Sequence, residues 1–181
     1  MFYITNTNSI IVLEKSKFMY GSKKFLIADA GEYGTPGKNG AQVLLKLWDQ
    51  DIEGDIIVGS SSCLTIELLN STIKRTINGD KKASKLTIIL NSNSNITLTG
   101  NSYYTSISNN ITDGSNLING SYVLTSYKEY LVSCSRTNFD DEINDGDTSD
   151  FDFDIFNNSC GKIINLKLFI ISFVLTIIIF N

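Results

Sequence analysis

Histidine is absent from the 181 residues of this chain. This absence excludes every mechanism in which histidine acts as the general acid, the general base or a member of a nucleophilic triad. Histidine is also a common zinc ligand, and the spacing of Cys63, Cys134 and Cys160 matches no metal site. We therefore expect no metal site, no cofactor and no enzymatic activity.

Basic side chains are also scarce, because the chain holds only 15 lysines and arginines. Before residue 140 the acidic and basic side chains nearly balance, and no basic cluster stands out. Nucleic-acid binding requires a concentrated basic surface. We therefore expect no nucleic-acid partner.

Proline occurs once, as Pro36, inside a segment rich in glycine that runs from Gly31 to Gly40. The pyrrolidine ring and the clustered glycines disfavour regular structure there. This segment predicts a loop between two strands.

Three stretches of the chain align with one another, and their first residues lie 21 and 22 positions apart. They are Val43–Leu47, Leu64–Leu68 and Leu86–Leu90. In each stretch the apolar side chains recur at every second residue, which indicates a strand with one buried face. Repeats of about this length are typical of solenoids, in which stacked turns bury a continuous core.

A second apolar stretch follows each of these strands after short polar residues that favour corners. The pairs are Ile52 with Ile56, Ile73 with Ile77, and Ile96 with Leu98, the last slightly out of step. The glycines Gly59, Gly79 and Gly100 close the repeats, and we expect them to supply positive φ angles.

Further turns are predicted on both sides of these repeats. Upstream, 10–13 and 25–27 have the pattern of strands. Downstream, the pattern continues through 103–107, and 122–124 and 130–132 could close the coil. The fold class expected is therefore all-β, a parallel β-helix with two or three short strands per turn. A β-sandwich remains an alternative, since it also has short strands at regular spacing.

An acidic segment from Asp140 to Asp154 holds eight carboxylates and no basic residue. Such a block repels itself and usually stays extended. Its Asn144–Asp147 stretch partly matches a calcium-binding loop, but the glycine is misplaced and the closing glutamate is missing. We therefore expect a β-helix domain over 1–135, a disordered acidic stalk over 136–162 and a hydrophobic helical anchor over 163–181.

The anchor contains Leu168–Phe180, a run without any charge. A bilayer-spanning helix needs about 20 apolar residues. The run also fits a removable glycosylphosphatidylinositol signal, with Asn158 or Ser159 as the attachment site and Cys160–Lys167 as the polar spacer. A plain membrane helix is the alternative, and both place the chain at a membrane.

Secretion agrees with two other features of the sequence. Asn-x-Ser/Thr sequons, which can carry glycans, occur at Asn70, Asn95, Asn110, Asn119 and Asn157. Cys134 could pair with Cys63 or Cys160 in an oxidising compartment. However, no basic segment followed by an apolar one stands at the start of the chain. We therefore expect the sequence to be the C-terminal part of a longer protein, or the product of a truncated gene model.

The repeats resemble a known group of proteins. The matching segments are Gln50–Ile56, Leu64–Thr72, Thr76–Asn78, Leu86–Leu90 and Ile96–Tyr103. They look like the repeat-built surface proteins of bacteria and microbial eukaryotes that are labelled carbohydrate-binding-domain-containing proteins. The resemblance covers about residues 2–125 and implies a right-handed parallel β-helix, although no sugar-contacting residue can be carried over from it.

Sugar binding would need exposed aromatic faces beside hydrogen-bonding groups. Trp48 follows the inward Leu47, so alternation directs it outward beside Asp49 and Gln50. Tyr103 and Tyr104 are the other aromatic candidates. Each of these residues could instead pack over a corner or a loop.

A polysaccharide lyase or glycoside hydrolase is the alternative function, because many parallel β-helices have such activities. Glycoside hydrolysis needs two carboxylates at a defined separation. The acidic residues Asp49, Asp51, Glu53 and Asp55 form the one acidic cluster in the body. Alternation places Asp51, Glu53 and Asp55 on a solvated strand face, and Lys74 should lie beside Glu53 as an exposed charge pair. We therefore expect a membrane-anchored cell-surface solenoid with a structural or adhesive role and with carbohydrate as its candidate ligand.

Overall fold

The computed structural model describes residues 1–18, 23–91, 93–109, 115–118, 120–128, 134 and 161–165. These residues form strands and connecting turns and contain no helix. The strands are β1 (Phe2–Thr5), β2 (Asn8–Glu14), β3 (Lys24–Asp29), β4 (Gln42–Trp48), β5 (Asp51–Glu53), β6 (Asp55–Val58), β7 (Cys63–Leu69), β8 (Thr72–Lys74), β9 (Lys85–Leu90), β10 (Asn95–Thr97), β11 (Ser102–Tyr104), β12 (Ser106–Asn109), β13 (Leu117–Ile118), β14 (Leu124–Ser126) and β15 (Gly161–Asn165).

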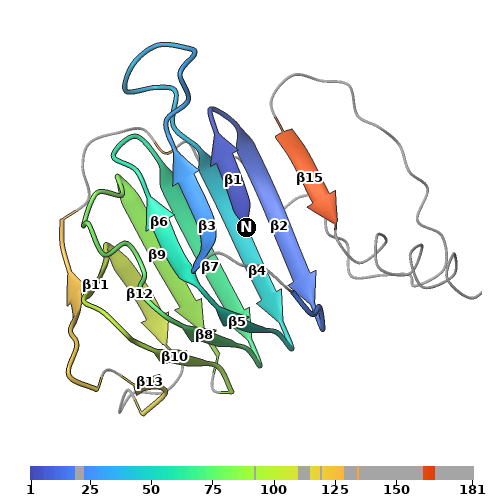
Figure 1. Ribbon diagram of the computed structural model, residues 1–181, viewed down its shortest axis with the longest axis vertical. Coiled ribbons are helices and arrows are strands. Elements are labelled where there is room, and N and C mark those ends of the chain that lie inside the picture. The colour runs from blue at the N-terminus through green and yellow to red at the C-terminus, as the bar shows by residue number, and fades with distance from the viewer. Residues whose placement is uncertain are drawn as a thin grey trace, which may run out of the picture.

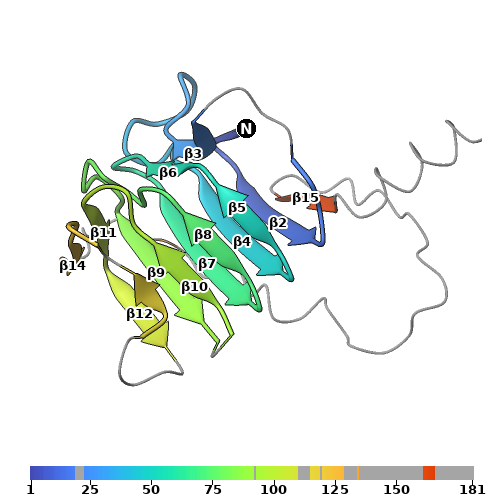
Figure 2. The same ribbon diagram turned by 60° about the horizontal axis from the view of Figure 1, so that its bottom comes forward.

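The strands stack into three parallel columns, which confirms a β-solenoid (Figure 1). The longest column is a sheet of six strands in the order β12-β9-β7-β4-β2-β15. The second column has the order β13-β10-β8-β5, and Figure 2 shows it beside the long sheet. The third column begins with β1-β3-β6, continues through a bridge between Ile56 and Ile77, and ends with β11-β14.

The predicted register between the repeats is confirmed. Val43 pairs with Leu64, which pairs with Leu86. In the second column Ile73 lies between Ile52 and Ile96. Because successive turns place equivalent side chains at the same point, each apolar residue packs directly on its counterpart in the next turn.

Alternation along the strands separates a buried face from an outer one. In β7 the burial pattern alternates from Leu64 to Leu68, with Ile66 fully buried and Thr65 half-buried. The same inward rows in β2, β4 and β9 join one core that runs through the coil. Burial of these aliphatic rows provides the main driving force for folding.

The corners between the first and second columns use left-handed backbone at residues other than glycine. Lys15, Asp49 and Asn70 have φ angles of 46°, 48° and 50° and occupy equivalent corners of successive turns. Asparagine and aspartate tolerate this conformation better than most residues. Asp49 and Asn70 therefore form corners, as the sequence predicted.

The predicted reason for the regular spacing of the glycines is wrong. Gly59, Gly79 and Gly100 are not among the glycines with positive φ, which in the described part of the chain are Gly34, Gly37 and Gly120. Close approach explains Gly59 instead, because a Cβ there would lie 1.8 Å from the Asp29 carboxylate.

The third repeat is out of step, as the sequence indicated, but the predicted counterpart of Ile77, Leu98, is wrong. Ile77 is matched in the next turn by Ser102, because the Tyr103 amide donates to the Ile77 carbonyl and the Ser102 hydroxyl accepts from the Ile77 amide. Leu98 is buried before this point, in the corner that follows β10. Two extra residues between Ile96 and Ser102 account for the slip.

Aromatic side chains gather in the first turn of the coil. The rings of Phe2, Phe18 and Phe25 contact one another edge to face, with centroids 5.5 to 6.2 Å apart. Phe25 is buried, and the other two pack against the core. The expected loop at 31–40 is also present between β3 and β4, where the Gly31 amide donates to the Asn39 carbonyl.

Three contacts join described residues after β14 to earlier turns of the coil. The Tyr127 hydroxyl donates to the Ala83 carbonyl. Cys134 forms a disulfide with Cys63 at the start of β7. Finally, β15 pairs with β2 at the edge of the long sheet (Figure 1). Of the two pairings that the sequence left open for Cys134, the structure selects Cys63.

The hydrophobic anchor differs from expectation where the structure describes it. Gly161–Asn165 form strand β15, so the helix expected over 163–181 does not begin at Ile163. The rest of the predicted stalk and anchor, and the 130–132 segment, lie outside the described residues. Within the described residues, no helix has the length and apolar character needed to cross a bilayer.

Candidate functional site

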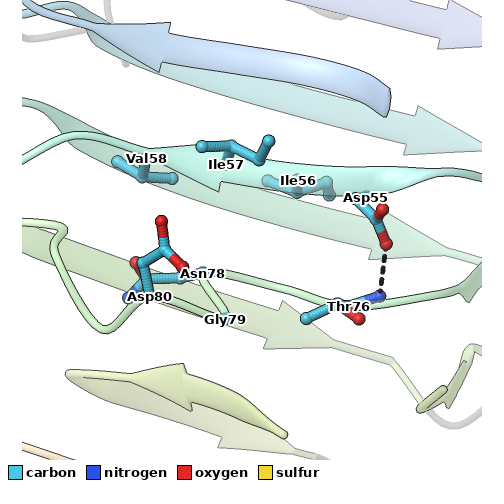
Figure 3. A pocket seen from close by; sticks show the side chains of 8 residues that line it. All are labelled: Asp55, Ile56, Ile57, Val58, Thr76, Asn78, Gly79 and Asp80. Atoms are coloured by element: carbon cyan, nitrogen blue, oxygen red, sulfur yellow. Dashed lines mark hydrogen bonds between the residues drawn. The ribbon is translucent and has the colours of Figure 1, made fainter. Parts of the chain in front are cut away.

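A cavity of about 210 Å³ lies on the third column of the solenoid (Figure 3). One wall is β6, and the other is the segment that follows β8 in the next turn. The lining residues are Asp55, Ile56, Ile57, Val58, Thr76, Asn78, Gly79 and Asp80. Most sites for small molecules combine an apolar floor with a few polar groups, and this cavity has both.

Two carboxylates line the cavity, Asp55 from β6 and Asp80 from the following turn. They lie on opposite sides of the group of lining residues in Figure 3. The Asp55 carboxylate accepts a hydrogen bond from the Thr76 amide at 3.2 Å. Asp80 is exposed and lies 3.5 Å from the Lys82 ammonium. Exposed ion pairs of this kind are weak, so a ligand hydroxyl can compete with Lys82 for the Asp80 carboxylate.

The cavity owes its shape to Asn78, which is buried and has left-handed backbone with φ of 48°. Its side-chain oxygen accepts from the Lys82 and Ala83 amides. Its side-chain nitrogen donates to the Tyr103 carbonyl and the Tyr127 hydroxyl. Asn78 therefore fixes the turn that carries Asp80 and is not free to contact a ligand.

Lys81 lies beside this turn, with its ammonium 5.5 Å from the Tyr103 ring centre and 5.7 Å from the Tyr127 ring centre. Both distances fall in the range of cation–π attraction. The aromatic ring of Tyr103, predicted to contact sugar, thus contacts a lysine next to the cavity. Tyr104 packs against the core and is half-buried.

Trp48, the other predicted sugar contact, is half-buried at the end of β4. It lies between Glu14 of β2 and Leu69 of β7 in the register of the long sheet. Leu69 is 50% exposed, so an apolar surface continues from the tryptophan across one strand. Trp48 is at the corner of the first and second columns, whereas Tyr103 and Tyr104 belong to the third column. The structure therefore does not bring the predicted aromatic sugar contacts together.

Asp49 occupies the corner beside Trp48 and is exposed. The Asn70 side-chain amide donates to its carboxylate, and the Lys15 ammonium lies 3.5 Å away. The hydrogen bond from Asn70 and the charge of Lys15 hold the pKa of Asp49 below its ordinary value of 3.8. The aspartate is therefore tied into the corner by its neighbours on both sides.

Gln50 differs from its predicted role as a surface contact, because it is only 3% exposed. Its side chain accepts from the Ser16 amide at 2.7 Å and donates to the Ser16 carbonyl at 2.7 Å. The next turns continue this buried ladder: the Gln50 amide donates to the Ser71 hydroxyl, and the Ser71 amide donates to the Ser94 hydroxyl. Gln50 stabilises the inside of the corner.

The predicted acidic cluster is divided among several environments. Asp51 and Glu53 are exposed on β5, on either side of the buried Ile52. The Glu53 carboxylate lies 3.6 Å from Lys74, which confirms the expected pair, and 3.4 Å from Arg75. Of the four acidic residues, Asp55 is the one that lines the cavity.

The predicted glycosylation sites fall partly within the described residues. Asn70 is exposed at a corner, as expected. Asn95 is half-buried at the first position of β10. The predicted sites Asn110 and Asn119, and the predicted attachment sites Asn158 and Ser159, lie outside the described residues.

Comparison with family models, curated proteins and solved structures finds no match for this chain. Within the described ranges, the structure gathers no three side chains of the types that ligate metals. The cavity beside Asp80 was not predicted from the sequence. Its two walls lie 25 residues apart along the chain, from Asp55 to Asp80, and the alignment of Ile56 with Ile77 could have indicated that these segments meet.

Proposed function

We propose that this chain is a cell-surface β-solenoid, anchored to a membrane through its C-terminal segment, that has a structural or adhesive role and binds carbohydrate. The solenoid is the part that the structure shows. The surface location, the anchor and the ligand are the proposal. We also expect a right-handed coil, since parallel crossover connections almost always have that hand.

The observation that carries the surface location is the disulfide between Cys63 and Cys134, whose Cα atoms are 6.1 Å apart. Disulfides persist in secreted and surface proteins and are rare in the reducing cytosol. The bond joins the chain after the last turn to the middle of the long sheet. It would protect the end of the domain outside the cell, where proteases act.

The sequence of the C-terminal region supports the attachment to a membrane. The acidic stretch before residue 155 favours an extended spacer, and the uncharged run 168–180 favours a lipid-anchor signal or a membrane helix. With a membrane helix, the pairing of β15 with β2 would place the membrane at the first turn of the solenoid. A lipid anchor at Asn158 or Ser159 would instead remove residues 161–165 from the mature chain.

The cavity beside Asp80 is the favoured position for a carbohydrate. Carboxylates accept hydrogen bonds from sugar hydroxyls, and the half-buried Ile57 offers an apolar surface for a sugar ring. Its volume of about 210 Å³ suits one ring of a polymer better than a large ligand. The resemblance to carbohydrate-binding surface proteins supports the same ligand class.

A polysaccharide pull-down with the full chain tests the ligand. We expect saturable binding to one of cellulose, xylan, mannan or chitin, and weaker binding by Asp80→Asn. The matched control is Glu32→Gln, which changes an exposed carboxylate on the loop after β3. Loss of binding in Trp48→Ala, with Asp80→Asn unaffected, would move the site to the Trp48 corner. Absence of binding by all folded variants would reject the carbohydrate role.

An enzyme that cleaves polysaccharide is the second candidate, since Asp55 and Asp80 line one cavity. Glycoside hydrolases use two carboxylates in this way. Incubation of the full chain with each polymer, followed by an assay for new reducing ends or unsaturated products, separates the two functions. Products that vanish in both Asp55→Asn and Asp80→Asn would establish the enzyme, whereas intact polymer on a binding-competent chain supports the proposed adhesin.

A further inference from the structure

The first edge of the long sheet carries a strand from the far end of the chain. β15 pairs with β2 in parallel, in the register Gly161 with Asn8 through Asn165 with Val12 (Figure 1). Its position is terminal in the order of the sheet, so β2 is its one neighbour among the described strands. The ladders that join β2, β4, β7, β9 and β12 do not involve β15.

The disulfide between Cys63 and Cys134 fixes the start of the segment that connects the coil to β15. Cys63 pairs with Gln42, which pairs with Asn8, and Asn8 pairs with Gly161. Cys63 and Gly161 thus lie in one row, three strand spacings apart. At about 4.8 Å per spacing, this is roughly 14 Å.

The connection is far longer than this separation requires. Residues 135–160 join Cys134, which is bonded to Cys63, to Gly161. Fully extended, this segment would reach roughly 85–95 Å. Its eight like charges between Asp140 and Asp154 repel one another and favour extension. The segment can therefore reach the β2 edge of a neighbouring molecule as well as its own.

We propose that, in the form of the chain that retains residues 161–165, β15 exchanges between two copies, so that each copy supplies this strand to the β2 edge of the other. The acceptor edge and the register are the same in both arrangements, so exchange forms every hydrogen bond that the closed monomer forms. Swapping of an identical element is a low-cost route to a dimer for this reason. The edge stays covered in both states, which protects it from unspecific strand pairing.

Concentration decides between the two states. A tether of this length gives β15 an effective concentration at its own edge in roughly the millimolar range. The monomer is therefore the dominant form in dilute solution. The exchanged dimer forms when the chain is concentrated toward about 1 mM or is crowded on a surface.

Cysteine cross-linking of full-length chains tests this exchange. All chains carry Cys160→Ser, one chain also carries Ile10→Cys, and a second chain with a mass tag carries Ile163→Cys. Ile10 and Ile163 are paired in the ladder. After the two chains are mixed near about 1 mM and oxidised, we expect a peptide that links position 10 of one chain to position 163 of the other.

The matched control replaces the Ile10→Cys chain by a Thr65→Cys chain. Thr65 shares the outer face and the row of Ile10, through Leu44, but lies two strands inside the edge. At least tenfold more cross-linking at position 10 than at position 65 supports exchange. Equal cross-linking at both positions overturns it, as does a link that forms within a chain carrying both cysteines but never between chains. If that double variant forms no link either, the pairing of β15 with β2 is itself refuted.

Discussion

Asn70 lies one turn after Asp49, and its side-chain amide donates a hydrogen bond to the Asp49 carboxylate. Both residues have left-handed backbone, with φ of 50° and 48°. Lys15 adds its charge from the turn before. Three equivalent corners are thus connected by side chains on the outside of the solenoid, beside the buried ladder that Gln50 begins.

Acid titration of the variant Asp49→Asn tests this corner. The pKa of Asp49 is lowered in the folded state, so its ionised form favours folding above its ordinary pKa of 3.8. That contribution is lost as the pH falls through the lowered pKa. We expect Asp49→Asn to melt below the parent protein at neutral pH and the difference to shrink as the pH falls below 3.8.

The backbone of the corner is preserved in this variant, because asparagine accepts positive φ as aspartate does. The control is Asp51→Asn, which alters an exposed carboxylate on β5. A melting difference for Asp49→Asn that stays constant with pH, or that grows in acid, would show that the carboxylate has no such role.

The variant Gln50→Leu tests the buried ladder. It removes the partners of the Ser16 amide and carbonyl inside the corner. A buried polar group left without a partner costs about 1–3 kcal/mol, so we expect a loss of that size in chemical denaturation. Gln42→Leu makes the same change at a half-buried position of β4 and should cost less. Equal losses would contradict the structural role of Gln50.

Truncation of the core should have a large effect in the middle turn. Ile66 is fully buried between Leu45 and Ile88 of the adjacent turns. We expect Ile66→Ala to lower the free energy of unfolding by about 2–5 kcal/mol, because it removes buried surface and leaves a cavity. Thr65→Ala, on the outer face of the same strand, should change it by less than about 1 kcal/mol. Similar effects at both positions would mean that β7 does not have the assigned faces.

Removal of the disulfide should destabilise the domain. The variant Cys134→Ser opens a loop with a sequence separation of 71 residues. Disulfides typically contribute about 2–4 kcal/mol to stability. We expect that loss in denaturation under oxidising conditions, whereas Cys160→Ser should leave stability unchanged. Loss of stability in Cys160→Ser alone would show that the wrong pair of cysteines has been assigned.

The sequence predicted the register of the repeats well because inward positions are apolar and recur at fixed intervals. Val43, Leu64 and Leu86 begin the three aligned stretches, and they do pair in the structure. The alignment failed after Ile96, because the buried counterpart of Ile77 is Ser102 and a serine gives no apolar signal. The prediction of surface contacts failed at Gln50 for a related reason: a polar residue in a corner can point inward when its hydrogen bonds are satisfied there.

The contacts that the end of the chain makes with distant residues could not be predicted from the sequence pattern. Cys134 could pair with either of two cysteines until its place beside Cys63 was known. The 161–165 segment adjoins an apolar run, which led to a spacer and helix being predicted where β15 forms. The cavity likewise depends on two segments from different turns, so neither Asp55 nor Asp80 was distinctive in its own stretch of sequence.

The oxidation state of the cysteines, measured in the cells that produce the chain, tests the proposed cell-surface location most directly. Free thiols are alkylated before lysis, and peptides are then mapped without reduction. For a cell-surface chain, we expect Cys63 and Cys134 to be recovered as one disulfide-linked peptide pair. Recovery of both residues as alkylated free thiols would place the chain in a reducing compartment and contradict a cell-surface function.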